Sequence, residues 1–170
     1  MRPSRRIAAL AVLVALAGCG ADAPTATHRR AAPPIAGTGS PGELALFWRE
    51  RTLACHLDPE AAAAECRTEG TSSEGSLTVR FEGTEDETAA VTASIDLAGV
   101  EPSRRAALAE GFLAVTVPEM FSRGDLRSAI QRWVRGALAA GRGSSAVIDG
   151  VGVTLTRRGE VATLTFVSAE

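Results

Sequence analysis

The chain contains no lysine and no tyrosine, and it has few histidines, cysteines and aromatic residues. All 18 basic residues are arginine, and the sequence holds two histidines, three cysteines, two tryptophans and five phenylalanines. Without tyrosine there is no tyrosine nucleophile or general acid, and the few aromatic rings offer little surface for stacking nucleic-acid bases. An arginine-only basic set beside abundant alanine is typical of a G+C-rich genome, so arginine counts carry little functional information.

The N-terminal apolar run is too short to span a membrane. It covers residues 7–16 and follows Arg2, Arg5 and Arg6, whereas a spanning helix needs about 20 apolar residues. A positive segment, a short apolar segment and small residues before a cysteine form the order of a secretory signal. We therefore expect export, by the general secretory route, because the residues after Arg6 depart from the twin-arginine pattern.

Residues 16–19 read Leu-Ala-Gly-Cys. This motif resembles the lipobox of bacterial lipoproteins at all four positions, and the resemblance is limited to residues 1–19. It implies cleavage after residue 18 and acylation of Cys19, with a diacylglyceryl group and chains such as palmitate. Two or more acyl chains anchor a protein firmly, so the resemblance implies a lipid anchor at the extracytoplasmic face of the cell membrane.

Loss of the signal makes the mature chain more acidic. The full sequence has 18 arginines against 20 acidic residues. Removing three arginines with the signal leaves 15 against 20, a net charge of −5. A net acidic exported protein is a poor match for nucleic acid, and we expect no nucleic-acid partner.

Composition divides the chain into three parts. Residues 1–18 form the expected signal peptide. Residues 19–42 comprise the lipidated cysteine and a tether rich in alanine, proline, threonine and glycine, which lacks apolar periodicity and is expected to be disordered. Residues 43–170 have the length of one domain with its own core.

Cys55 and Cys66 remain as an even pair, and such a pair usually forms a disulfide in an exported protein. On one unbroken helix they would lie about 16 Å apart, which is too far for a bridge. The sequence Asp58-Pro59 supplies a break between them. We therefore predict that one helix ends near Cys55 and another runs from Pro59 through residues 61–64.

Local patterns predict the remaining elements. Ser40 and Glu43 form a capping box with proline between them, which marks a helix start. Alternation of apolar residues predicts strands, and helical spacing predicts two further helices. The strands are expected at 77–81, 91–97, 146–148, 151–155 and 162–166, with residues 157–160 as the hairpin turn between the last two. The helices are expected at 102–118, with Leu108, Phe112 and Val115 on its apolar face, and at 125–140, with Asp125 as its N-cap and Gly141 at its end. The expected fold is α+β, a two-layer antiparallel sheet with helices packed on one face and an order of roughly ααββααββ.

The sequence holds no recognisable catalytic set. No serine lies in a Gly-x-Ser-x-Gly motif, and His56 is the only histidine in the domain. A metal site at Cys55 and His56 lacks further ligands, so we expect no metal and no cofactor. Asp96, Glu110 and Asp149 are carboxylates whose mutual geometry the sequence does not give, so no catalytic residue is assigned.

Two surface patterns could bind a partner. Arg123, Arg127 and Arg135 recur at helical spacing and form a basic stripe that could meet anionic lipid or an acidic protein. The outward face of the last hairpin is rich in threonine, as at Thr154 and Thr163, and could receive a partner or meet water. Both patterns also fit solvated surfaces.

The sequence favours a membrane-tethered cell-envelope lipoprotein with a non-catalytic binding or scaffolding domain, whose partner could be another envelope protein. One alternative is a small extracytoplasmic enzyme that uses Asp or Glu carboxylates. Another is a small-ligand carrier with a cavity between sheet and helices. A pocket with two or more converging carboxylates would favour the enzyme.

We predict that Cys19→Ala abolishes acylation and membrane retention while residues 43–170 stay folded, because no other segment is hydrophobic enough to anchor the chain. Intact mass and membrane fractionation measure both effects. A Cys19→Ala protein that still partitions fully with membranes would contradict the lipoprotein interpretation.

Overall fold

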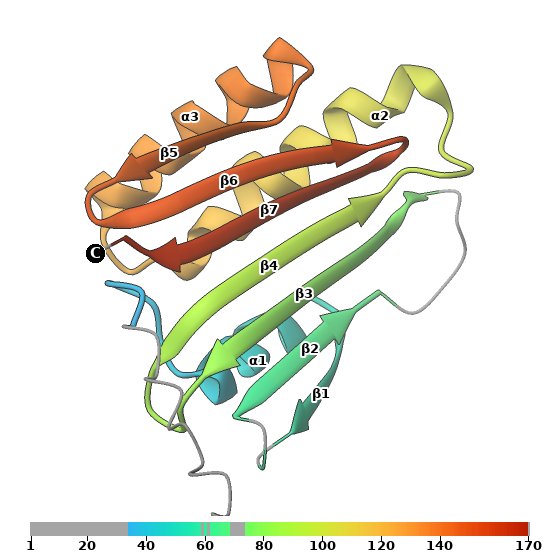
Figure 1. The fold of residues 1–170 in the computed structure, drawn as a ribbon. Coiled ribbons are helices and arrows are strands. Elements are labelled where there is room, and N and C mark those ends of the chain that lie inside the picture. Colours follow the sequence, from blue (N-terminus) through green and yellow to red (C-terminus); the bar gives the residue numbers. More distant parts are fainter. Residues whose placement is uncertain (1–33, 59, 61, 69–73, 170) are drawn as a thin grey trace, which may run out of the picture. The chain divides into compact units, whose positions relative to one another are not determined.

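The computed structural model describes residues 34–58, 60, 62–68 and 74–169 (Figure 1). The expected signal peptide, Cys19 and the tether up to residue 33 lie outside these residues. Within the described part of the chain, no helix combines the length and apolarity that a membrane crossing requires.

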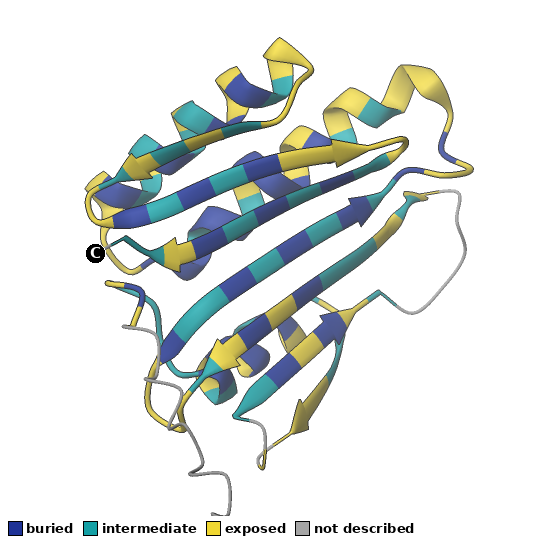
Figure 2. Cartoon of the chain, in the orientation of Figure 1, coloured by how far each residue is buried: buried dark blue, intermediate teal, exposed yellow. Residues whose placement is uncertain are grey.

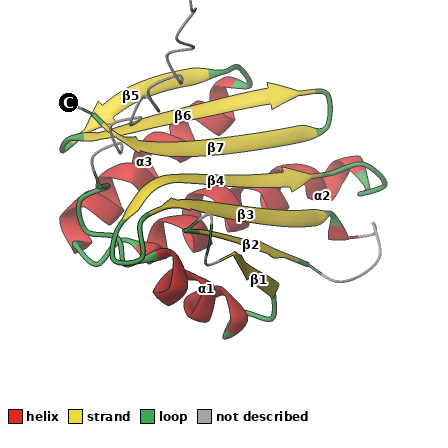
Figure 3. Ribbon diagram, turned by 60° about the horizontal axis from the view of Figure 1, so that its bottom comes forward, coloured by secondary structure: helices red, strands yellow, loops and turns green. Residues whose placement is uncertain are grey.

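The domain is an α+β structure in which helices pack against one seven-stranded antiparallel sheet, as the sequence predicts. The helices lie on one side of the sheet, behind it in Figure 1 and below it in Figure 3. The strand order is β1-β2-β3-β4-β7-β6-β5. The strands are β1 (Ala54–Asp58), β2 (Ala63–Arg67), β3 (Ser76–Gly83), β4 (Thr88–Asp96), β5 (Ser144–Ile148), β6 (Val151–Arg158) and β7 (Val161–Ser168).

The predicted element order ααββααββ is wrong in the first half of the chain. Where a second helix was expected, the chain forms the hairpin of β1 and β2; Pro59 and Ala61 themselves lie outside the described residues. Alanine favours helix locally, but Ala64 pairs with Phe81 of β3 and is buried. Burial against the core and pairing with β3 therefore override the local preference.

Helix α1 (Pro41–Arg49) begins at the expected capping box. The Ser40 hydroxyl accepts a hydrogen bond from the Glu43 amide, and the Glu43 carboxylate accepts one from the Ser40 amide. The chain before it is also packed, because Ile35 is buried and its amide donates to the Thr88 carbonyl at 2.8 Å. Packing against the domain thus begins before residue 43.

A helical run of changing pitch follows β4. Helix α2 (Pro102–Ala109) continues as a π-helical segment, η2 (Glu110–Thr116), and ends in a 3₁₀ turn, η3 (Val117–Met120). The wider π turn shifts which side chains face the sheet. Leu113 and Val117 are buried, whereas Val115, which helical spacing had placed on the core face, is exposed.

Helix α3 (Gly124–Ala140) packs against the half of the sheet that contains β5 and β6. It begins one residue before Asp125, which lies in the first turn and does not cap the helix as predicted. At the other end Gly141 adopts a left-handed conformation with φ of 69° and ends the helix, as predicted. This glycine is suited to the position because it has no Cβ to clash.

The β4–β7 pair joins the two halves of the chain into one core. Residues 90–96 of β4 pair with residues 161–167 of β7 in continuous register. The inward side chains alternate with outward ones along both strands, as the banding in Figure 2 shows. The largest fully buried side chains include Trp48, Phe81, Phe121 and Phe166.

Cys55 and Cys66 form a disulfide. They lie directly opposite each other on β1 and β2, with Cα atoms 4.0 Å apart. The expected reversal of the chain between them is a β-hairpin rather than a break between helices. The bridge fixes the edge strand β1 to the neighbouring inner strand β2.

We predict that reducing this disulfide lowers the free energy of unfolding by about 3 kcal/mol, because a short loop in the unfolded chain is no longer closed. The fold should persist, since most of the core lies on the other strands. Urea unfolding with and without reductant measures the change. Two free thiols, detected by alkylation of the exported protein before reduction, would contradict the assignment.

Candidate functional site

A half-open pocket of about 450 Å³ lies where α2, the end of α3 and the β6–β7 turn meet. Leu97, immediately after β4, and Val161 of β7 line it from the sheet. Its apolar lining also includes Pro102, Ala106, Ala109, Leu138, Ala139 and Ala162, and its charged residues are Arg105, Arg157 and Glu160.

Arg105 is held on two sides. Its Nε donates a hydrogen bond to the Val100 carbonyl oxygen at 2.8 Å. Its Nη1 forms an ion pair with the Glu160 carboxylate. These contacts connect the start of α2 to the β6–β7 turn and fix the guanidinium at one wall of the pocket.

Arg157 is less engaged. Its single hydrogen bond runs from Nη2 to the Leu138 carbonyl oxygen at 3.4 Å, which is long for an N–H···O bond. The other N–H groups of this guanidinium make no hydrogen bond or ion pair within the described chain. With two guanidinium groups and one carboxylate, the pocket carries a net positive charge.

Such a pocket can bind an anionic group beside a short apolar body. Arginine matches carboxylate and phosphate oxygens through paired N–H donors, and the alanine and leucine side chains provide an apolar wall. The Arg105–Glu160 pair is partly exposed, with side-chain exposures of 31% and 42%. Ion pairs of this kind contribute little stability, so a ligand could rearrange it at small cost.

The predicted basic stripe is occupied by contacts within the protein. Arg123 bonds to both Asp125 and Asp149. Arg135 pairs with Glu110 at 3.0 Å. Arg127 donates from Nε and Nη2 to the Phe121 carbonyl oxygen. The role of these arginines toward an anionic partner stays a prediction.

The Arg123 pairs also shift two pKa values. The hydrogen bond from Arg123 is the main reason that the pKa of Asp125 is lowered, and the hydrogen bond to Asp125 is the main reason that the pKa of Arg123 is raised. A lowered carboxyl pKa stabilises the folded state above the pKa of the unfolded chain. That contribution is lost as the pH falls through the folded-state pKa.

The three carboxylates named in the sequence do not converge. Asp96 accepts a hydrogen bond from the Ala98 amide, Glu110 pairs with Arg135, and Asp149 pairs with Arg123. His56 lies exposed on β1, opposite Glu65 of β2. Among the residues that the structure describes, no group of three His, Cys, Asp or Glu side chains is placed to hold a metal ion.

The threonine-rich face forms two in-register rows across the sheet, and no described helix covers it. Ser94 and Thr163 share a hydrogen bond between hydroxyl oxygens at 3.0 Å, and so do Ser145 and Thr154 at 3.1 Å. The rows are Thr78, Ser94, Thr163 and Thr156, then Thr92, Thr165, Thr154 and Ser145. These hydroxyls bond partly to one another. The face therefore has no distinct feature that would bind a partner.

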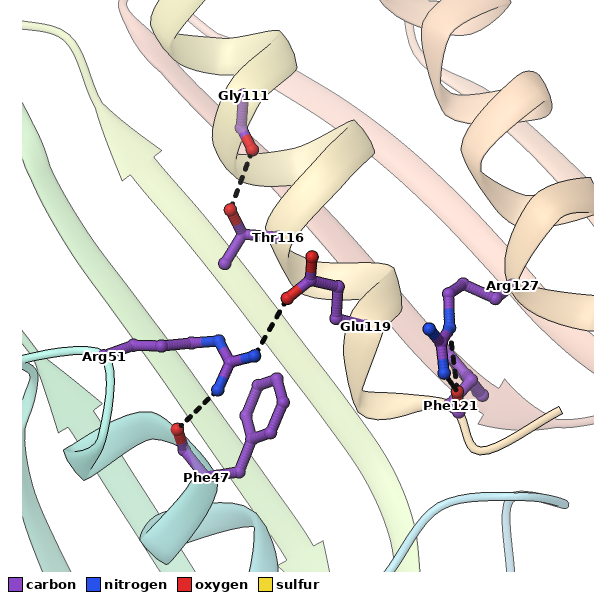
Figure 4. A network of polar contacts seen from close by, with 7 residues as sticks. All are labelled: Phe47, Arg51, Gly111, Thr116, Glu119, Phe121 and Arg127. Carbon is purple, nitrogen blue, oxygen red and sulfur yellow. Dashed lines mark hydrogen bonds and ion pairs between the residues drawn. The ribbon is translucent and has the colours of Figure 1, made fainter. Parts of the chain in front are cut away.

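A second polar network, shown in Figure 4, holds α1 against the helical run. Arg51 donates to the Phe47 carbonyl oxygen at 3.2 Å and to the Glu119 carboxylate at 2.9 Å. Its guanidinium carbon lies 3.5 Å from the centre of the Phe47 ring. Both hydrogen bonds and the ring contact lie within the protein, and we interpret this network as structural.

The sequence did not identify the pocket residues. Arg157 and Glu160 were placed only in a hairpin turn, and Arg105 had no pattern around it. Arg105 and Glu160 come together only because the β6–β7 turn lies against the start of α2. Residue spacing within one helix or strand does not predict a contact between two separate elements.

Comparisons with protein-family models, with curated proteins and with solved structures each found no match. The functional argument therefore rests on the residues and geometry of this chain.

Proposed function

We propose that this protein is a cell-envelope lipoprotein, tethered to the extracytoplasmic face of the membrane, whose domain is a non-catalytic binding module. Its ligand is a small amphiphilic anion, bound in the pocket beside the β6–β7 turn. The lipobox at residues 16–19 and the Cys55–Cys66 disulfide support the location.

The observation that carries the proposal is the guanidinium of Arg157. It is exposed beside an apolar pocket and makes one long hydrogen bond within the described chain, so its other donors are accessible to a ligand. A carboxylate or phosphate would satisfy those donors, while Leu97 and Leu138 would cover an apolar body. A volume of about 450 Å³ lies within the usual range of small-molecule pockets.

The charges in the pocket favour binding over acid–base chemistry. A recognisable carboxylate acid–base site often holds a pair of carboxyl groups whose environments separate their pKa values. Glu160 is the one carboxylate that lines this pocket, and it is paired with Arg105. The ion pair holds the Glu160 carboxylate against Arg105, which suits a fixed counter-ion in a binding pocket.

We predict that octanoate binds the soluble Cys19→Ala protein and that Arg157→Gln weakens this binding by about tenfold, the size expected for loss of a charge-assisted hydrogen bond. Octanol, which has the same chain without the charge, should be insensitive to Arg157→Gln. Isothermal titration calorimetry measures both affinities.

A second pair of variants tests the location. Ala106 lines the pocket and Ala107 does not, although both are exposed on α2. Ala106→Phe should fill the pocket and abolish binding of octanoate, whereas Ala107→Phe should leave it intact. Equal effects of the two alanine variants, or an octanoate affinity that Arg157→Gln leaves unchanged, would contradict the proposed site.

A further inference from the structure

Strand β5 is an edge strand without the usual protection. Among the described strands it pairs with β6 alone, and its residues Ser-Ser-Ala-Val-Ile include no charge and no proline. The Val147 side chain is 69% exposed. Natural edge strands are normally blocked by charges, proline or a covering element, because free backbone groups there invite another strand.

The opposite edge of the sheet is protected. Strand β1 carries His56 and Asp58, is followed by Pro59 in the sequence, and is held to β2 by the disulfide. The contrast shows that the open edge at β5 is specific to one end of the sheet.

The flank of α3 beside β5 also has uncharged side chains, which are small apart from that of Trp133. Helix α3 packs over β5 and β6, and its other flank faces η2 and η3, where Arg135 meets Glu110 and Arg127 meets Phe121. Trp133 lies on the flank away from those contacts, because helical spacing separates it from them.

Trp133 is half-buried, and the positions beside it on this flank are small. Ala129 precedes it by one turn, and a Cβ built on Gly136 would meet nothing within 4 Å. A partly exposed tryptophan in uncharged surroundings is a frequent centre of protein interfaces. The β5 edge and this flank therefore form one surface suited to a protein partner.

We propose that this surface binds a second copy of the same chain. The two β5 strands pair antiparallel about a two-fold axis at Ala146, so that the two seven-stranded sheets continue into one. This inference is independent of the ligand pocket, which lies beside α2 and the β6–β7 turn.

The sequence around β5 is self-complementary in this register. Each Ser145 lies opposite Val147 of the second copy, on the outward face, and each Ser144 lies opposite Ile148, on the helix side. Arg142 precedes the strand and Asp149 follows it, so antiparallel pairing places Arg142 of one copy opposite Gly150 of the other, one residue from the oppositely charged Asp149, at both ends. The Asp149 Oδ2 accepts from Arg123, which leaves Oδ1 for Arg142 of the second copy.

A two-fold contact also explains why one open edge can be tolerated. Each copy uses its β5 edge once, so the pair leaves only the protected β1 edges at the two ends of the combined sheet. The assembly closes at two copies and does not propagate.

Cysteine cross-linking in membranes tests the register with the full-length protein. Two differently tagged chains, one carrying Ser145→Cys and the other Val147→Cys, are produced together and oxidised. Opposite residues have Cβ atoms about 5 Å apart, close to disulfide geometry, whereas diagonal neighbours are about 7–8 Å apart. We expect a mixed dimer at least five times more abundant than the dimers formed by either variant alone.

The control pair combines Glu82→Cys with Val147→Cys, since Glu82 is exposed on β3, away from the β5 edge. Absence of the mixed dimer, or equal cross-linking in the control pair, would overturn the proposal. A cross-linked product at another mass would also overturn it, because the occupant of the edge would then be a different protein.

A second measurement does not depend on cysteine. Sedimentation of the detergent-solubilised protein should show two copies, and Val147→Arg should shift it to one copy, since a charge on the edge blocks strand pairing. Leu46→Arg is the matched control, because Leu46 is an exposed apolar residue on α1. A parent protein that sediments as one copy would contradict the proposed dimer.

Discussion

The pairing of β4 with β7 is the constraint on which the rest of this domain depends. Residues 97–160 separate the two strands, and closing a loop of that length costs about 4 kcal/mol of chain entropy. Each large apolar side chain that becomes fully buried contributes roughly 1.5–3 kcal/mol. Ile95, Leu164 and Phe166 on this pair are all buried, so packing at the seam is sufficient to offset the closure.

The candidate pocket is built at one end of that seam. The last pair of the β4–β7 register joins Asp96 to Val161, and the Leu97 amide then donates to the Glu160 carbonyl oxygen at 3.1 Å. This contact brings the β6–β7 turn, with Arg157 and Glu160, against the start of α2. The position of the charged groups is therefore a consequence of the strand register rather than of a local loop motif.

Much of the fold could be predicted from the sequence because many of its patterns are local. Alternation along β3, β4, β6 and β7 identified four strands, and the capping box at Ser40 fixed the start of α1. The alanine-rich segment before Cys66 was misjudged, because its strand conformation comes from pairing with Phe81 and Val79 of β3. The π turn moved Val115 out of the core for a related reason, since helical spacing assumes a constant pitch.

The candidate site was less predictable than the fold. The sequence identified the basic stripe from spacing alone, but spacing does not show that Glu110 and Asp149 pair with Arg135 and Arg123. In the pocket, Arg105 is joined to Glu160 by tertiary contact. A site assembled from separate elements leaves no periodic signal in a single sequence.

Native-state hydrogen exchange, resolved along the chain, tests the central role of the β4–β7 pair most directly. The account predicts that the backbone amides of β4 and β7 exchange most slowly, with one shared free energy equal to that of global unfolding. Faster exchange of β5, β6 and β7 together, while β3 and β4 remain protected, would contradict it. That result would mean that the two halves of the sheet unfold independently.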